Sequence, residues 1–120
     1  MLEKLLHMSA LFDFYSPLLT DKQQRCLQMH LLEDFSLSEI SQELGISRQA
    51  VYDMLRRSEQ LMQQYEDKLH LVQRSEKDQT QLKLLTRKLE DLKRTAAVKS
   101  TNEMKQNIDD IIQQIAALIK

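Results

Sequence analysis

Apolar residues recur along most of this chain at spacings of three and four, which places them on one face of an α-helix. The first stripe consists of Leu5, Met8, Phe12 and Tyr15, and Leu2 and Leu11 widen it. It closes before Pro17, because the residue that precedes a proline is pushed away from helical backbone angles. A single Gly and a single Pro in 120 residues leave almost no turn chemistry for a β fold. The pattern therefore predicts an all-α protein.

Three Ser/Thr-x-x-Glu/Gln sequences indicate where later helices begin. In such a capping box, the hydroxyl and the carboxylate or amide satisfy two backbone N–H groups at the start of a helix. The boxes are Thr20 with Gln23, Ser36 with Glu39, and Ser100 with Glu103. The first predicts a helix that runs to about Leu32, and the third opens the last helix of the chain.

The stretch from Ser36 to Met62 predicts two helices joined by a tight turn. Gly45, the only glycine, follows the first helix, and Ser47 stands where the N-cap of the second helix belongs. The apolar positions suit the inner face of two helices that cross steeply: Leu37, Ile40, Leu44, Ile46, Val51 and Leu55. This is the pattern of a helix-turn-helix unit.

A second set of residues is predicted to face outward from the second helix. Its members are Ser47, Arg48, Gln49, Tyr52, Asp53, Arg56 and Arg57. Arg can bridge guanine and Gln can bridge adenine in the major groove, and the first residues of the second helix reach the base edges. We therefore predict groove contacts for Arg48, Gln49, Tyr52 and Arg56, with Asp53 on the same side. The alternative is a helical module that serves protein contacts only.

Backbone phosphates are the predicted partners of the two residues that flank this set. N–H groups point out of a helix start, where a phosphate can bind, so Ser47 is placed at a phosphate. Arg57 is expected to contact a second one.

Four segments of the chain resemble the YlxM-like family of small bacterial cytoplasmic proteins. They are LFDFYSPLLTDKQQ (11–24), LEDFSLSEIS (32–41), SRQAVYDMLRRSE (47–59) and YEDKLHL (65–71). The stretch SLSEISQELGISRQAVYDMLRR is also similar to the fourth conserved region of bacterial sigma factors. The resemblance covers about the first 75 residues. It implies a sigma-like helix-turn-helix and a regulatory link to the signal recognition particle pathway, a link inferred from gene neighbourhood.

The second helix of the motif is predicted to continue to about Arg74, since neither Gly nor Pro interrupts it. Its apolar side is a heptad-like stripe: Val51, Leu55, Ser58, Met62, Tyr65, Leu69 and Val72. Such a stripe suits packing along another helix. The polar interval 76–81 is the predicted site of a bend.

Two amphipathic helices are predicted beyond the bend, folded as a hairpin. One carries Leu82, Leu85, Leu89 and Leu92, and the other carries Met104, Ile108, Ile111, Ile115 and Leu118. The predicted domains are a helix-turn-helix domain with an extended recognition helix (1–75) and a helical tail for dimerisation or partner binding (76–120). We favour a homodimer; an intramolecular bundle and a partner from the signal recognition particle suit the same stripes.

Charge weighs against strong DNA binding by a single copy. Residues 1–75 hold 8 Lys/Arg and 11 Asp/Glu, and residues 76–120 hold 9 and 7. Nucleic-acid binders usually carry a basic excess, because phosphate neutralisation supplies much of the affinity. A dimer would bind double-stranded DNA better than a monomer. The acidic balance also motivates an alternative function, a protein- or RNA-interaction module of the signal recognition particle machinery.

The sequence offers little for catalysis, cofactors or membranes. Its three His are far apart, and neither they nor the lone Cys26 have partners at a metal-ligand spacing. One glycine cannot build a phosphate-cradling loop. We expect no enzyme activity, cofactor or metal. A single Cys, together with the absence of a signal-peptide pattern or a membrane-length apolar run, predicts a cytoplasmic protein that does not insert into membranes.

Overall fold

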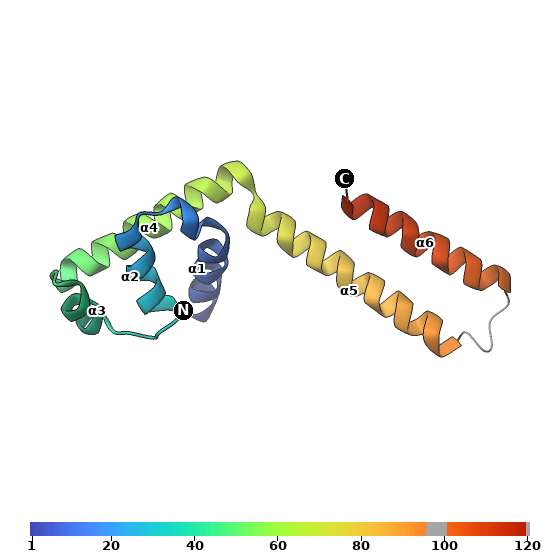
Figure 1. Cartoon of the computed structure of the whole chain (residues 1–120), viewed down its shortest axis with the longest axis horizontal. Helices are drawn as coiled ribbons and strands as arrows, with labels where there is room; N and C mark the ends of the chain where they lie inside the picture. The colour runs from blue at the N-terminus through green and yellow to red at the C-terminus, as the bar shows by residue number, and fades with distance from the viewer. Residues whose placement is uncertain (96–100, 120) are drawn as a thin grey trace. The chain divides into compact units, whose positions relative to one another are not determined.

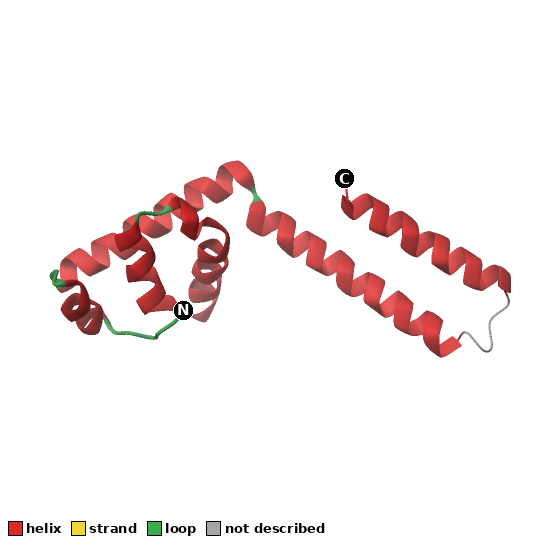
Figure 2. Ribbon diagram, in the orientation of Figure 1, coloured by secondary structure: helices red, strands yellow, loops and turns green. Residues whose placement is uncertain are grey.

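The computed structural model describes residues 1–95 and 101–119, and its secondary structure there is entirely helical (Figure 2), which confirms the all-α prediction. The elements are α1 (Leu2–Tyr15), the short 3-10 helix η1 (Ser16–Leu18), α2 (Asp21–Leu31), α3 (Leu37–Leu44), α4 (Arg48–Leu69), α5 (Leu71–Thr95) and α6 (Thr101–Ile119). The chain forms two compact units, the head (Met1–Val72) and the hairpin (Gln73–Lys120).

Two of the three predicted capping boxes are formed. The Thr20 hydroxyl accepts the Gln23 backbone N–H at 3.2 Å, and the Gln23 side chain accepts the Thr20 N–H at 3.0 Å. Ser36 and Glu39 make the same reciprocal pair, with both distances 3.1 Å. These bonds satisfy N–H groups that would otherwise lack partners at the starts of α2 and α3. The third predicted box includes Ser100, which lies outside the described residues.

The core of the head forms where α1, α2 and α3 pack against α4 (Figure 1). Its buried members are Met8, Leu11, Tyr15, Leu19, Cys26, Leu27, Met29, Ile40, Val51, Leu55, Met62 and Val72. Helix α1 buries part of its predicted apolar stripe and leaves the N-terminal part exposed. Met8, Leu11 and Tyr15 are buried, whereas Leu5 is 42% exposed and Leu2 is 70% exposed.

The prediction of one continuous helix to Arg74 is wrong. Helix α4 ends at Leu69, His70 adopts a left-handed conformation with φ +55°, and α5 begins at Leu71. The predicted bend at 76–81 is also wrong, since those residues lie inside α5. A residue far away in the sequence stabilises this break, since the Tyr15 hydroxyl accepts the Leu71 N–H at 3.2 Å.

The stripe on α4 is covered within the head. Val51, Leu55, Ser58, Met62 and Glu66 are all buried, and α4 contacts α1, α2 and α3. Most of this face therefore packs inside a single chain rather than along a partner helix. Among the described residues, exposed large hydrophobic side chains remain on both units, for example Leu6 and Leu32 on the head and Leu82 on the hairpin.

The hairpin consists of α5 and α6, which run antiparallel (Figure 1). Among its described residues, the buried hydrophobics are Leu85 on α5 and Ile111 on α6. Leu82 and Leu89, predicted in the same stripe as Leu85, are each 52% exposed. In the described part of the chain, no helix combines the length and the apolar character that a membrane crossing requires.

Candidate nucleic-acid interface

The turn between α3 and α4 is held by backbone bonds that converge on one carbonyl. Gly45 adopts the left-handed conformation with φ +67°, and its N–H donates to the Ser41 carbonyl at 2.9 Å. The Ile46 N–H donates to the same oxygen at 3.2 Å, which closes the helix end in the manner of a Schellman motif. The Ser41 hydroxyl also donates to the Ile46 carbonyl. Both ends of α3 are therefore fixed by specific bonds.

Helix α4 begins at a conventional N-cap. Ser47 has an extended backbone, and its hydroxyl accepts the Ala50 N–H at 3.0 Å. This bond fixes the first turn of α4, from which the predicted base-reading side chains project. Ser47 thus has a structural role in addition to its predicted place at a phosphate.

The predicted site residues lie on the accessible side of α4. Arg48, Gln49, Arg56 and Arg57 are exposed, Ser47 is exposed at the cap, Tyr52 is 49% exposed and Asp53 is half-buried. The opposite side of the same turns is fully buried at Val51. The structure therefore brings all seven residues to one surface of the helix-turn-helix. Their role in binding DNA remains a prediction.

Two of these side chains are held by neighbours before any ligand binds. The Arg48 guanidinium donates to the Ser38 hydroxyl on α3 at 3.2 Å. The Gln49 amide donates to the Asp53 carboxylate, one turn further along α4, at 3.2 Å. An amide has two N–H donors and a carbonyl, so Gln49 keeps one N–H and its oxygen for a base while it holds Asp53. Prior positioning of this kind reduces the conformational entropy lost on binding.

Ser38 was not identified from the sequence, because its pairing with Arg48 depends on how α3 and α4 cross. The signal in the sequence was weak, since Ser38 is a polar residue next to Glu39 in the first turn of α3 and has no motif of its own. The bond places Arg48 beside α3, at the edge of the outward surface rather than at its centre. Gln49, Asp53, Arg56 and Arg57 form the centre of that surface, since they lie farthest around α4 from its buried side.

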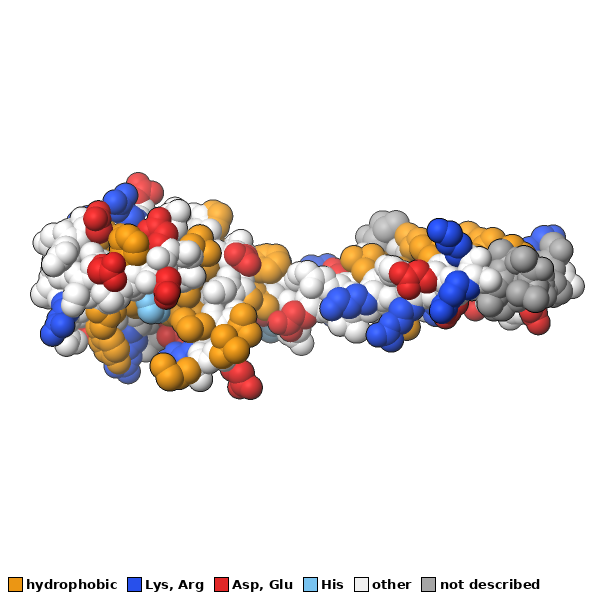
Figure 3. All heavy atoms as spheres, turned by 90° about the horizontal axis from the view of Figure 1, so that it is seen from below, with side chains coloured by type: hydrophobic (Ala, Val, Ile, Leu, Met, Phe, Trp, Pro, Cys, Tyr) orange, Lys and Arg blue, Asp and Glu red, His pale blue; other side chains and the backbone are white. Residues whose placement is uncertain are grey.

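The head that carries this surface has an excess of acidic side chains. The head holds 7 Lys/Arg and 11 Asp/Glu, and Figure 3 shows acidic groups spread over the face of the head in view. On α3, Glu43 lies 3.9 Å from the exposed guanidinium of Arg25, a pair of little energetic value. Hydrogen bonds from the Ser36 backbone and hydroxyl lower the pKa of the Glu39 carboxyl. Glu39 therefore stays ionised as the cap of α3.

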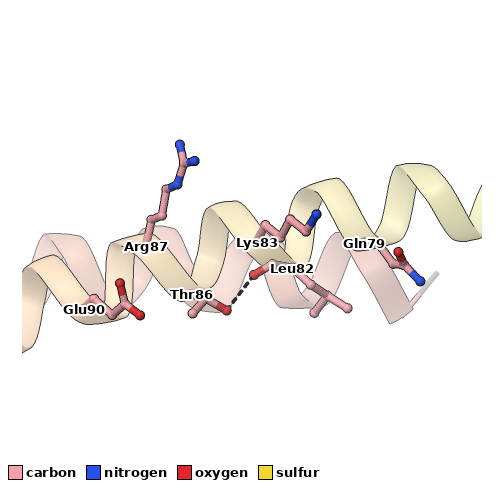
Figure 4. A pocket seen from close by; sticks show the side chains of 6 residues that line it. All are labelled: Gln79, Leu82, Lys83, Thr86, Arg87 and Glu90. Carbon is pink, nitrogen blue, oxygen red and sulfur yellow. Dashed lines mark hydrogen bonds between the residues drawn. The ribbon is translucent and has the colours of Figure 1, made fainter.

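A shallow hollow on the hairpin does not form a site for a small molecule. It is lined by Gln79, Leu82, Lys83, Thr86, Arg87 and Glu90, all on α5. Figure 4 shows these side chains spaced along the helix without converging, and the Thr86 hydroxyl donates to the Leu82 carbonyl of its own helix at 2.9 Å. Within residues 1–95 and 101–119, no group of three or more His, Cys, Asp or Glu is placed to hold a metal ion.

The sequence matches the family UPF0122, described as "Putative helix-turn-helix protein, YlxM / p13 like", over residues 2–108. A UPF0122 protein from Oceanobacillus iheyensis is 43% identical over 111 residues, which span 92% of this chain and 99% of the relative. One from Halalkalibacterium halodurans is 51% identical over 77 residues, 64% of this chain and 71% of the relative. One from Streptococcus gordonii is 50% identical over 70 residues, 58% of this chain and 64% of the relative. These matches confirm the resemblance to the YlxM-like family.

Proposed function

Because this chain belongs to the UPF0122 family of YlxM/p13-like helix-turn-helix proteins, we propose that it is a cytoplasmic regulatory protein that binds double-stranded DNA. One observation carries the proposal. The first turns of α4 present accessible polar side chains, from Arg48 to Arg57, outside the buried side of a closed helix-turn-helix. The N-terminal part of the second helix is the part that reaches base edges in such units.

Each residue of the row has a proposed role. Arg56 reads guanine from the centre of the surface, and Gln49 reads adenine while Asp53 fixes its amide. Arg48 contacts guanine at the edge of the surface, where Ser38 holds its guanidinium until DNA is bound. Tyr52, half exposed, makes apolar contact in the groove.

Phosphate contacts are proposed for Ser47 and Arg57, which orient the head without reading sequence. Few such contacts are available to one head, because acidic side chains outnumber basic ones. We therefore propose that the protein acts as a homodimer. Two linked heads raise the effective concentration of the second contact and offset the weak binding of the first.

A direct test is cross-linking in the native cell, followed by sequencing of the recovered DNA and RNA. The wild type is compared with an Arg48→Ala/Gln49→Ala variant and with Lys68→Ala. Lys68 is exposed in the last turn of α4, so its removal deletes the same formal charge outside the proposed surface. Discrete DNA sites in the wild type and Lys68→Ala, lost in the double variant, are expected. A wild type without discrete DNA sites would overturn the proposal.

The acidic excess of the head favours a second candidate function, as a protein- or RNA-interaction module of the signal recognition particle machinery. A helix that fits the major groove of DNA cannot enter the deep, narrow groove of an RNA duplex, so RNA would contact loops or another face. The cross-linking experiment separates the two functions. Recovery of one structured RNA, equally from the wild type and the Arg48→Ala/Gln49→Ala variant, would support the second.

A further inference from the structure

The hairpin has more exposed large hydrophobic side chains than buried ones among its described residues. Among its described residues, only Leu85 and Ile111 are buried hydrophobics, against twelve in the head. Five large aliphatic side chains beside them are 43–56% exposed: Leu82, Leu89, Ile108, Ile112 and Ile115. We call these five residues the apolar face. Units of this size rarely fold on a single small core and are often completed by oligomerisation.

The five residues lie on the same side of the hairpin. At 3.6 residues per turn, Leu82 and Leu89 lie roughly 40–60° to one side of Leu85 around α5. Ile108 and Ile115 lie roughly 40–60° from Ile111 in the same rotational sense around α6, with Ile112 further round. Because α5 and α6 are antiparallel, equal rotational senses point to the same side of the pair. The apolar face therefore runs across both helices as one strip.

The two helices that carry the apolar face have opposite charge. Helix α5 holds seven Lys/Arg and four Asp/Glu, an excess of three positive charges. Helix α6 holds one Lys and three Asp/Glu, an excess of two negative charges. A partner that suits this face is thus an apolar surface with an acidic helix opposite α5 and a basic helix opposite α6. A second copy of the same hairpin has those properties.

We propose that the apolar face is the surface on which two copies of this chain pair, as a four-helix bundle with its two-fold axis parallel to the helices. This axis sets α5 of one protomer against α6 of its partner, so opposite charges meet. A two-fold axis perpendicular to the helices would instead place α5 of one protomer against α5 of its partner, and the two basic helices would repel each other. The proposal deepens the proposed function, because it names the surface that joins the two heads, but it requires no DNA binding.

A specific ion pair follows from this arrangement. Lys88, Asp91 and Leu92 of α5 line one hollow together with Asn107 and Asp110 of α6, which fixes the level at which the helices run past each other. Glu90 therefore lies within about one helical turn of the level of Lys105. Within one chain, helical geometry puts these two side chains on opposite outer edges of the apolar face. A two-fold axis parallel to the helices keeps their level and brings Glu90 of one protomer beside Lys105 of its partner.

The first test is the mass of the full chain in solution, without DNA, by sedimentation equilibrium. Leu89→Glu and Ile112→Glu place a charge in the apolar face, whereas Leu84→Glu is a matched control. Leu84 is 48% exposed, close to the 52% of Leu89, but lies on another side of α5. The wild type and Leu84→Glu are expected to be dimers, and the two face variants to dissociate at least 100-fold more readily. Circular dichroism checks that every variant stays helical.

Other outcomes overturn the proposal. A monomeric wild type at tens of micromolar would mean that the head or a different protein covers the face. A dimer that survives Leu89→Glu and Ile112→Glu would use another surface. If the face variants lose helicity, the oligomeric states of Glu90→Lys and Lys105→Glu test the proposal instead, because both residues are exposed. Each alone is expected to weaken the dimer about 3- to 10-fold, and the double swap to restore it; failure to restore it would exclude the proposed axis.

DNA binding does not enter these measurements, so the two proposals fail separately. A dimer that recovers no discrete DNA sites would overturn the proposed function and leave the pairing surface intact. A monomer whose recovered DNA sites are lost in Arg48→Ala/Gln49→Ala would overturn the pairing surface and support the proposed function.

Discussion

The Tyr15 hydroxyl donates a 2.6 Å hydrogen bond to the Glu66 carboxylate in the buried part of the head. Both groups also accept N–H groups from the first turn of α5: Leu71 donates to Tyr15 at 3.2 Å, and Val72 donates to the Glu66 carboxylate at 3.0 Å. The pair therefore acts as the N-cap of α5, supplied by α1 and α4 rather than by the preceding residue. It holds the chain in the break at His70 without a glycine.

Tyr15→Phe is expected to lower the free energy of unfolding of the head by about 1–3 kcal/mol, because Glu66 and the Leu71 N–H each lose a buried partner. The ring itself keeps its packing, including its contact with Tyr65 at a centroid distance of 6.0 Å. Urea denaturation followed by circular dichroism measures the loss. Tyr52→Phe, which removes a hydroxyl from an exposed ring, is the control and should change little. Equal stabilities for the two variants would show that the bond has no energetic role.

Alkaline pH is expected to destabilise the head through the same residue. Burial, with the neighbouring Glu66 carboxylate, raises the pKa of Tyr15 above its unfolded value near 10. The folded state thus holds this proton more tightly, so the stabilisation is complete below pH 10 and is lost as pH rises through the folded pKa. The free energy of unfolding should fall more steeply above about pH 10 in the wild type than in Tyr15→Phe.

Ionisation of Cys26 is expected to lower the free energy of unfolding in the same direction. Burial raises the pKa of its thiol, so this loss of stability begins near pH 9. This loss is present in both proteins, so the comparison of wild type with Tyr15→Phe isolates the tyrosine. Parallel pH profiles for the two would contradict the assignment.

Local signals in the sequence were sufficient for most helix boundaries. The Ser36–Glu39 box and Gly45 act within a few residues of the backbone that they shape, so their pattern predicts α3 almost to the residue. The break at His70 could not be predicted in this way. Its support comes from Tyr15, about 55 positions earlier, and a His in the left-handed conformation has no sequence signature.

The candidate site shows the same difference between features set by nearby residues and features set by residues far apart in the sequence. Exposure of Arg48, Gln49 and Arg56 follows from the helical period of α4, and the prediction placed them on the accessible side. The bond from Arg48 to Ser38 depends on the crossing of two helices and was not anticipated. A periodic pattern identifies which side of a helix faces out, but it does not identify the neighbour of each side chain there.

Gly45→Ala is expected to cost about 1–2 kcal/mol of stability, the usual cost of a left-handed conformation for a residue with a Cβ. An added Cβ would meet no atom within 4 Å, so the cost arises from the backbone angle of φ +67° and not from a clash. Gly45→Asn should cost less, because Asn tolerates this conformation better than Ala. Thermal unfolding of both variants measures the difference. A larger loss for Asn than for Ala would refute the conformational explanation.

Ser58→Ala is expected to stabilise the head by about 1 kcal/mol. Ser58 is fully buried on α4, and its hydroxyl oxygen has no hydrogen-bond partner among the described residues. Burial of a hydroxyl without a partner is unfavourable, and alanine removes it without opening a large cavity. The midpoints of urea denaturation measure this effect, with Ser47→Ala for comparison. Ser47→Ala should destabilise the head, because it removes the N-cap hydrogen bond of α4. Destabilisation by Ser58→Ala would indicate that the hydroxyl is satisfied.

Arg56→Ala and Arg57→Ala are expected to weaken DNA binding in different ways, although they are adjacent and remove the same charge. Arg56 is proposed to read a base, so its loss should cost about 1–3 kcal/mol on the preferred site and relax the preference at one position. Arg57 is proposed to contact phosphate, so its loss should weaken all duplexes alike and reduce the salt dependence by about one ion. Titrations of preferred and scrambled duplexes at several salt concentrations separate the two effects. If both variants kept the sequence preference and shared one salt slope, the outward row of α4 would not be reading bases.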